Sequence, residues 1–145
     1  MQRFVYPAIL TPDTEEEGFV VTFVDLPEAI TQGEDVEDAL REAADCLEEA
    51  IANRLVIGLS IPPPSSIQKG QYAVSLAVQT AAKAALYIAL QKAKVTKTEL
   101  AKRLRSNEKE VQRLLDPRHP SKLSRLESAL AAVGQRLIVS MQSAA

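Results

Sequence analysis

The spacing of apolar residues changes once along this 145-residue chain, and that change constrains the fold more than any other feature. Before residue 78, short stretches rich in Val, Ile, Phe and Tyr end at turn-forming residues and predict strands. After residue 80, apolar residues recur every three or four positions, which is the spacing of amphipathic helices. The chain therefore predicts two domains, 1–78 and 79–145, joined without a flexible linker.

The first domain is predicted to be a small sheet with one helix packed on its face. The expected strands cover residues 3–10, 18–24, 29–33 and 71–78. Asp35 can cap a helix that continues to Leu55, because apolar residues recur on one face of this segment. Three consecutive prolines, Pro62 to Pro64, exclude helix between that segment and the last strand.

The second domain is predicted to be helical until its last residues. The expected helices cover 80–93, 97–104, 108–115 and 122–133. Beyond Gly134, the segment RLIVSM (136–141) predicts a short closing strand, so the chain as a whole is expected to be α+β. That strand would leave an open edge in a monomer, which predicts a homodimer or a higher oligomer. The apolar residues expected to supply the dimer surface are Leu126, Leu130, Leu137, Ile138 and Val139.

Charge is strongly segregated along the chain, although the formal net charge is only -2. Residues 1–60 hold three basic and fourteen acidic residues, a net charge of -11. Residues 91–125 hold eleven basic and four acidic residues, a net charge of +7. This pattern favours one surface for a cation-rich partner and another for a phosphate backbone, with two unrelated solvated faces as the alternative.

The two short helices over 97–104 and 108–115 have the spacing of a helix-turn-helix. Ala101 lies where the two helices must cross closely, and Val111 and Leu114 follow ten and thirteen residues later. Asn107 can cap the second helix. This spacing predicts a DNA-reading pair, whereas an ordinary helical hairpin with a basic face is the alternative.

Four residues in and after the turn depart from the usual helix-turn-helix pattern. Arg105 occupies the place of a residue at positive φ, commonly glycine, and Ser106 stands where an apolar residue is expected. Glu108 and Glu110 suit the positive end of the second helix, yet they would repel phosphates. The sequence leaves open whether tight DNA binding survives these departures.

If the pair reads DNA, the second helix must direct its outer face into the major groove. Gln112 can pair with adenine, and Arg113 can pair with guanine or grip a phosphate. The expected DNA contacts lie on this helix, at the start of the first helix and beyond the second, and are Lys97, Thr98, Asn107, Glu108, Lys109, Gln112, Arg113, Arg118 and Lys122.

We expect no enzyme, no metal and no cofactor. Asp13, Asp25, Glu28 and Asp35 are the candidate ligands of a metal-dependent nuclease, but Asp25 is typical of a turn and Asp35 of a helix cap. No nucleophile arrangement or glycine-rich phosphate loop is present. One Cys and one His cannot supply a zinc site, and His119 is assigned to a turn or a phosphate contact.

Four segments of the chain resemble HicB-type antitoxins of the HicA–HicB toxin–antitoxin family. They are GFVVTFVDLPEAITQGEDVEDAL (18–40), IPPPS (61–65), KAALYIAL (83–90) and LLDPRHPSKLSRLESALAAVGQRL (114–137). The resemblance implies a truncated RNase H-like domain over 1–78, without nuclease carboxylates, that neutralises a small basic mRNA-cleaving HicA-type toxin. It also implies a C-terminal helix-turn-helix over 79–145 that dimerises and represses the module's own promoter by binding operator DNA.

The sequence does not single out the residues that would contact the toxin. Glu28, Glu34 and Glu42 are examples from the acidic surface of residues 1–60. A standalone helix-turn-helix regulator with a ligand- or protein-sensing N-terminal domain is the alternative function. No apolar run suits a membrane span and no signal peptide is indicated, so we expect a cytoplasmic protein without membrane contact.

Overall fold

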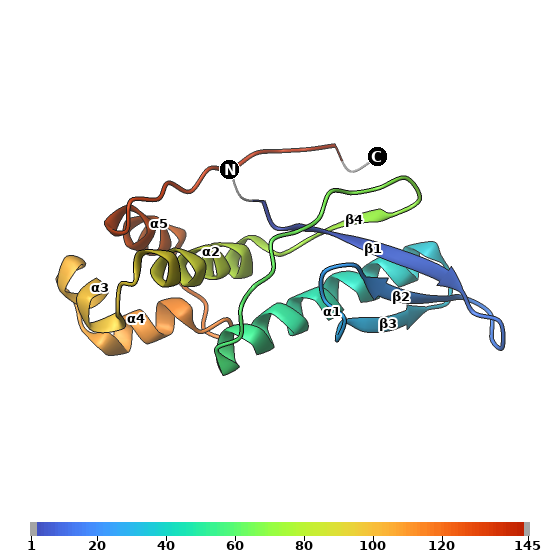
Figure 1. The fold of residues 1–145 in the computed structure, drawn as a ribbon, viewed down its shortest axis with the longest axis horizontal. Coiled ribbons are helices and arrows are strands. Elements are labelled where there is room, and N and C mark those ends of the chain that lie inside the picture. The colour runs from blue at the N-terminus through green and yellow to red at the C-terminus, as the bar shows by residue number, and fades with distance from the viewer. Residues whose placement is uncertain (1–2, 144–145) are drawn as a thin grey trace. The chain divides into compact units, whose positions relative to one another are not determined.

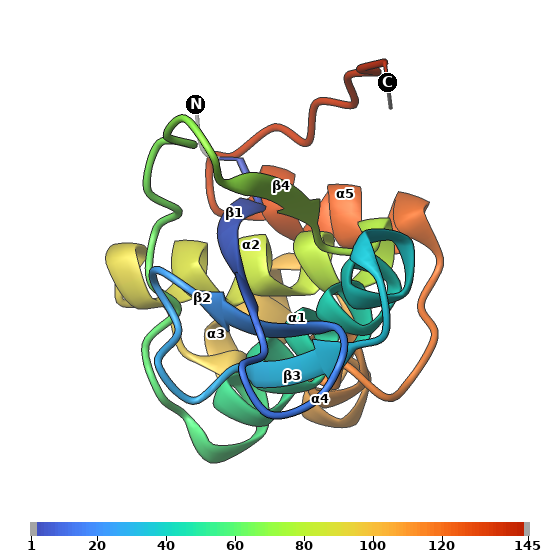
Figure 2. The same ribbon diagram turned by 90° about the vertical axis from the view of Figure 1, so that its right-hand side faces the viewer.

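Four antiparallel strands and one long helix form the N-terminal part of the computed structural model, which describes residues 3–143. The strands are β1 (Val5–Pro12), β2 (Phe19–Phe23), β3 (Ile30–Gly33) and β4 (Tyr72–Ser75), in the order β3-β2-β1-β4. Helix α1 (Val36–Ile57) runs along one face of this sheet (Figure 1), and Figure 2 shows β1 between β2 and β4. The predicted sheet with one helix on its face is confirmed.

The start of α1 lies close to the end of β3. Asp35 caps the helix as predicted, because its Oδ1 accepts a hydrogen bond from the Asp38 amide at 2.8 Å. A Cβ at Gly33 would lie only 2.3 Å from the backbone nitrogen of Ala39, so the close approach requires glycine. The core beneath the helix is built from Tyr6, Ala8, Val21, Phe23, Ala39, Ala43, Leu47 and Ile51.

The proline-rich segment between α1 and β4 is held by hydrogen bonds to Tyr6 on β1 and to Asp25, which follows β2. The Tyr6 hydroxyl donates to the Pro62 carbonyl at 2.7 Å, and the Ser65 amide donates to the Asp25 carboxylate at 2.9 Å. Burial raises the pKa of Tyr6 to about 12; the Asp25 charge adds to this rise and the Arg54 charge opposes it. Asp25 therefore serves as an anchor for this segment.

Four helices follow: α2 (Val78–Ala93), α3 (Lys97–Arg103), α4 (Glu108–Leu115) and α5 (Leu123–Ala132). All four predicted helices are confirmed, although β4 ends at Ser75 and is shorter than predicted. The Glu48 carboxylate accepts hydrogen bonds from the Ala77 amide and the Thr80 hydroxyl, each at 2.6 Å. These contacts hold the start of α2 at Val78, so the strand cannot continue to residue 78. None of the described helices is long and apolar enough to cross a membrane.

The chain divides into two compact units between Ala81 and Ala82. The core of the C-terminal unit is built from the buried residues Ala82, Leu86, Ala89, Leu90, Leu100, Ala101, Val111, Leu114, Leu126, Ala129 and Leu130. Leu126 and Leu130, which were expected to contribute to a dimer surface, are thus committed to this core. Residues 1, 2, 144 and 145, which the predicted domain ranges include, lie outside the described residues.

The predicted closing strand over 136–141 is wrong. Residues 135–143 form neither strand nor helix, and Ile138, Val139 and Met141 are 63%, 78% and 98% exposed. A strand needs a neighbouring strand for its backbone hydrogen bonds, and the described residues of the C-terminal unit contain none. Apolar composition alone therefore does not make this segment a strand within one copy of the chain.

Candidate nucleic-acid interface

The turn between α3 and α4 has the backbone conformation that its position predicted. Arg105 has a φ of 53°, in the left-handed region where glycine is usual. Two hydrogen bonds close the turn: the Arg105 amide donates to the Lys102 carbonyl at 3.1 Å, and the Ser106 amide to the Ala101 carbonyl at 2.9 Å. This pair of bonds is typical of a helix ended by a left-handed residue. The tight turn is thus retained without glycine.

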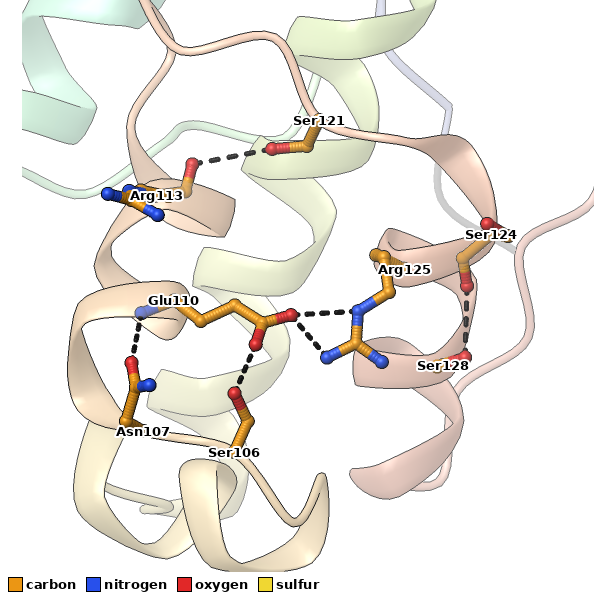
Figure 3. A network of polar contacts seen from close by, with 8 residues as sticks. All are labelled: Ser106, Asn107, Glu110, Arg113, Ser121, Ser124, Arg125 and Ser128. Atoms are coloured by element: carbon orange, nitrogen blue, oxygen red, sulfur yellow. Dashed lines mark hydrogen bonds and ion pairs between the residues drawn. The ribbon is translucent and has the colours of Figure 1, made fainter.

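Glu110 on α4 accepts hydrogen bonds from two other elements (Figure 3). The Ser106 hydroxyl in the turn donates to its carboxylate, and Arg125 on α5 donates to it through Nε at 2.8 Å and also through Nη2. These contacts, with the Ser106 hydrogen bond first and the Arg125 guanidinium second, hold the pKa of Glu110 below its usual range. An apolar residue was expected at position 106. Serine fits there because its hydroxyl has the Glu110 carboxylate as an acceptor.

The other glutamate at the start of α4 also has a partner. The Thr98 hydroxyl on α3 donates to the Glu108 carboxylate, and the Asn107 Oδ1 caps α4 by accepting from the Glu110 amide at 2.9 Å. The predicted cap is confirmed. Because Arg125 is ion-paired with Glu110, the repulsion expected between that carboxylate and a phosphate is partly compensated within the protein.

The apolar seam between α3 and α4 is the one that the spacing predicted. Leu100, Ala101, Val111 and Leu114 are all buried, at 0%, 4%, 0% and 3% exposure, and Leu104 is partly buried against them. With these side chains inward, the outer faces of both helices are left to solvent. Ala101 is small enough for the close crossing that a helix pair of this kind requires.

All nine residues predicted to contact DNA are exposed. Four of them, Asn107, Lys109, Arg113 and Lys122, line an open cleft of about 390 Å³, together with Glu110, Leu114, His119, Pro120, Ser121 and Arg125. The other five do not line it: Lys97 and Thr98 lie at the start of α3, Glu108 and Gln112 on α4, and Arg118 in the connection to α5. The structure thus brings part of the predicted set together around one basic cleft.

Two residues that matter for this site were missed from the sequence. Arg125 had no local signal, because its partner Glu110 lies fifteen positions away. Lys83 is fully buried in α2 and donates hydrogen bonds to the end of α4. A lysine within the otherwise apolar run AAKAAL was the available signal.

The acidic residues of the N-terminal unit are not equivalent. Glu28 forms a two-pronged ion pair with Arg54, with Nε–Oε2 and Nη2–Oε1 distances of 2.6 and 3.0 Å. The Arg54 hydrogen bond lowers the pKa of Glu28, and partial burial opposes that shift. Glu34 and Glu42 are exposed like Glu28, but neither carboxylate is ion-paired in this way among the described residues. Of the three named examples, the latter two leave their negative charge available to a partner.

The carboxylates considered for a nuclease site have local tasks. Asp13 accepts from the Glu15 amide at 3.0 Å, Asp25 anchors Ser65, and Asp35 caps α1. Within residues 3–143, no group of three or more His, Cys, Asp or Glu side chains is placed to hold a metal ion.

Comparison with known proteins places the chain in a family. Residues 5–85 match the family described as HicB-like antitoxin of bacterial toxin–antitoxin system. Antitoxin HicB of Escherichia coli K12 is 35% identical over 136 residues, which cover 94% of this chain and 98% of that protein. Antitoxin HicB 1 of Photorhabdus laumondii is 36% identical over 137 residues, covering 94% and 86%. Antitoxin HicB of Pseudomonas fluorescens Pf0-1 is 34% identical over 132 residues, covering 90% of each chain.

The chain therefore belongs to the HicB-like antitoxin family of bacterial toxin–antitoxin systems. The resemblance predicted from its sequence is confirmed. Membership supports a regulatory rather than a catalytic role and implies a HicA-type toxin as partner.

The contact between Glu110 and Arg125 predicts a dependence of stability on pH. The folded chain lowers the pKa of Glu110, so the stabilisation is fully present above the carboxylate's ordinary value of 4.5 and is lost as pH falls through the lowered value. Glu110→Gln should destabilise the chain at neutral pH by about 1 kcal/mol or less, since both side chains are partly exposed. The difference from wild type should shrink as pH falls below 4.5 and through the lowered pKa of Glu110.

Urea unfolding of both proteins across this pH range measures the difference. Glu127→Gln, which removes an exposed carboxylate from α5, is the matched control. A gap between wild type and Glu110→Gln that stays constant down to the acid limit would contradict the assignment.

Proposed function

We propose that this protein is an antitoxin that neutralises a HicA-type mRNA-cleaving toxin through its N-terminal unit and represses its own promoter through its C-terminal unit. The observation that carries the proposal is the exposed basic face of the α3–α4 pair, in a family member whose other unit is acidic. A net charge of +7 over residues 91–125 suits a phosphate backbone, and -11 over residues 1–60 suits a basic toxin.

The fold assignments behind this proposal have separate support. The antiparallel sheet with α1 on its face supports a truncated RNase H-like domain, and the left-handed turn at Arg105 with its buried seam supports a helix-turn-helix. The functional ranges remain those predicted, 1–78 and 79–145. A cytoplasmic location likewise stays a prediction.

The exposed glutamates Glu34 and Glu42 allow the toxin-binding role to be tested in the full chain. Because like charges across an interface slow association, Glu34→Lys combined with Glu42→Lys should lower the association rate for the HicA-type toxin by about tenfold at low salt. Surface plasmon resonance measures this rate. Inhibition of mRNA cleavage reports neutralisation.

The control for that experiment is Glu127→Lys, which changes one exposed charge in the C-terminal unit. It should leave toxin association near the wild-type rate, and the effect of the paired variant should fade as salt screens the charges. A fragment of residues 1–81, which ends with the N-terminal compact unit, should neutralise the toxin alone. Tight binding of the toxin by residues 82–145 would overturn this assignment.

Dimerisation through the C-terminal segment is also proposed. Ile138 and Val139 are 63% and 78% exposed, and a second copy of the chain would cover this apolar surface. Replacing both with Asp should give monomers in analytical ultracentrifugation. Val56→Asp, at an exposed apolar position of the N-terminal unit, is the control and should not change the mass. An unchanged dimer in the first variant would place the interface elsewhere.

DNA reading by α4 predicts two kinds of mutational effect. Gln112→Ala and Arg113→Ala should each weaken promoter binding by about 1–3 kcal/mol and relax preference at one base pair. Lys122→Ala should instead weaken promoter and scrambled DNA alike, because a phosphate contact carries no sequence information. Wild-type binding should fall steeply with salt.

Electrophoretic shift titrations with promoter and scrambled DNA measure these affinities. Lys69→Ala, which removes an exposed lysine from the N-terminal unit, is the charge-matched control for Lys122→Ala. If wild type does not prefer the promoter, and neither Gln112→Ala nor Arg113→Ala changes affinity, the pair is only a helical hairpin.

A further inference from the structure

Lys83 differs from every other charged side chain that the structure describes, because it alone is buried, at 0% exposure. Its ammonium donates to the carbonyls of Arg113 and Leu114 at 2.9 and 3.0 Å, and to the Ser121 hydroxyl at 2.7 Å. Three acceptors therefore match the three hydrogens of the ammonium. Two of these acceptors belong to the last turn of α4, and the third lies in the connection between α4 and α5.

The position of these acceptors explains what the ammonium can do. The last carbonyls of a helix have no partner within that helix, and a cation there is favoured by the helix dipole. Beyond α4, the chain turns at once: the Asp116 amide donates to the Arg113 carbonyl at 3.2 Å, and the His119 amide to the Asp116 carbonyl at 3.1 Å. Lys83 thus joins the end of the helix to the far side of this turn at Ser121.

An apolar side chain would fill the same space at a lower free-energy cost of removal from water. Burial lowers the pKa of Lys83, because it disfavours the charged ammonium, and the nearby Asp116 carboxylate opposes that shift. Without the ammonium, the carbonyls of Arg113 and Leu114 would lose their buried donor. What the charge adds over an apolar residue is a defined geometry at the end of α4.

We propose that Lys83 is the positioning residue of the DNA-reading surface, holding Arg113 on α4 in register with Arg118 and Lys122 beyond it. This inference rests on the proposed repressor function. Base reading needs a fixed distance between the base-contacting helix and the phosphate-contacting connection, whereas binding to any DNA needs only the positive charge. Lys83 should therefore affect discrimination between sequences without touching DNA.

The test compares Lys83→Met with Lys92→Met in the full chain. Both substitutions remove one positive charge from α2 and insert the same side chain, but Lys92 is exposed. Shift titrations with promoter and scrambled DNA should show that Lys83→Met loses about tenfold in promoter preference relative to Lys92→Met. Affinity for scrambled DNA and its dependence on salt should be the same in both variants.

A second readout reports geometry directly. In ¹⁵N NMR spectra, amide shifts over residues 113–122 should move in Lys83→Met and stay in place in Lys92→Met. If Lys83→Met does not fold, Lys83→Gln, which keeps an uncharged donor, replaces it and should show a smaller loss of preference in the same direction.

The outcomes separate the inference from the function on which it rests. A wild type that prefers the promoter, with a Lys83 variant of equal preference, overturns the positioning role alone. The positioning role is also overturned if the Lys83 variant loses affinity for promoter and scrambled DNA in parallel, since that pattern indicates general destabilisation. A wild type without promoter preference overturns the proposed repressor function and the inference with it.

Discussion

The helix α4 depends on two polar anchors, one near each end. Near its start, the Glu110 carboxylate joins the α3–α4 turn, through Ser106, to α5, through Arg125. At its end, the buried Lys83 ammonium joins α2 to the last carbonyls of α4 and to Ser121. A helix of only 8 residues has little stability of its own, so these contacts, with the buried seam, hold its outer face in place. Every further property of the candidate DNA-reading surface depends on that support.

Contacts within the C-terminal unit also engage the two glutamates at the start of α4. Counted along the sequence, Glu108 and Glu110 oppose the binding of phosphate at the start of α4. In the folded chain, Glu110 is paired with Arg125 and Glu108 accepts from Thr98, so both carboxylates stabilise the helix pair. Lys109, Arg113 and Lys122, which line the cleft, are exposed and favour a negatively charged ligand there.

In the N-terminal unit, the residues that carry the family signature act on one another. Asp25 in the run FVDLPEA holds Ser65 at the end of IPPPS, and Glu28 in the same run holds Arg54 near the end of α1. Arg54 in turn donates to the Ser60 carbonyl at 2.8 Å, so the loop leaving α1 is held as well. These carboxylates therefore shape the unit, and under the proposed function the exposed Glu34 and Glu42 are the candidates for contact with a basic toxin.

The sequence by itself determined the helices, the caps at Asp35 and Asn107 and the left-handed turn at Arg105, because each depends on residues a few positions apart. Tertiary structure decided which charged groups are engaged: Glu28 with Arg54, Glu110 with Arg125 and Lys83 with Ser121 are 26, 15 and 38 positions apart. It also decided the state of residues 136–141, whose apolar composition suits a strand but which have no strand neighbour among the described residues. Local spacing can place a side chain on a face, but only the folded chain brings its partner there.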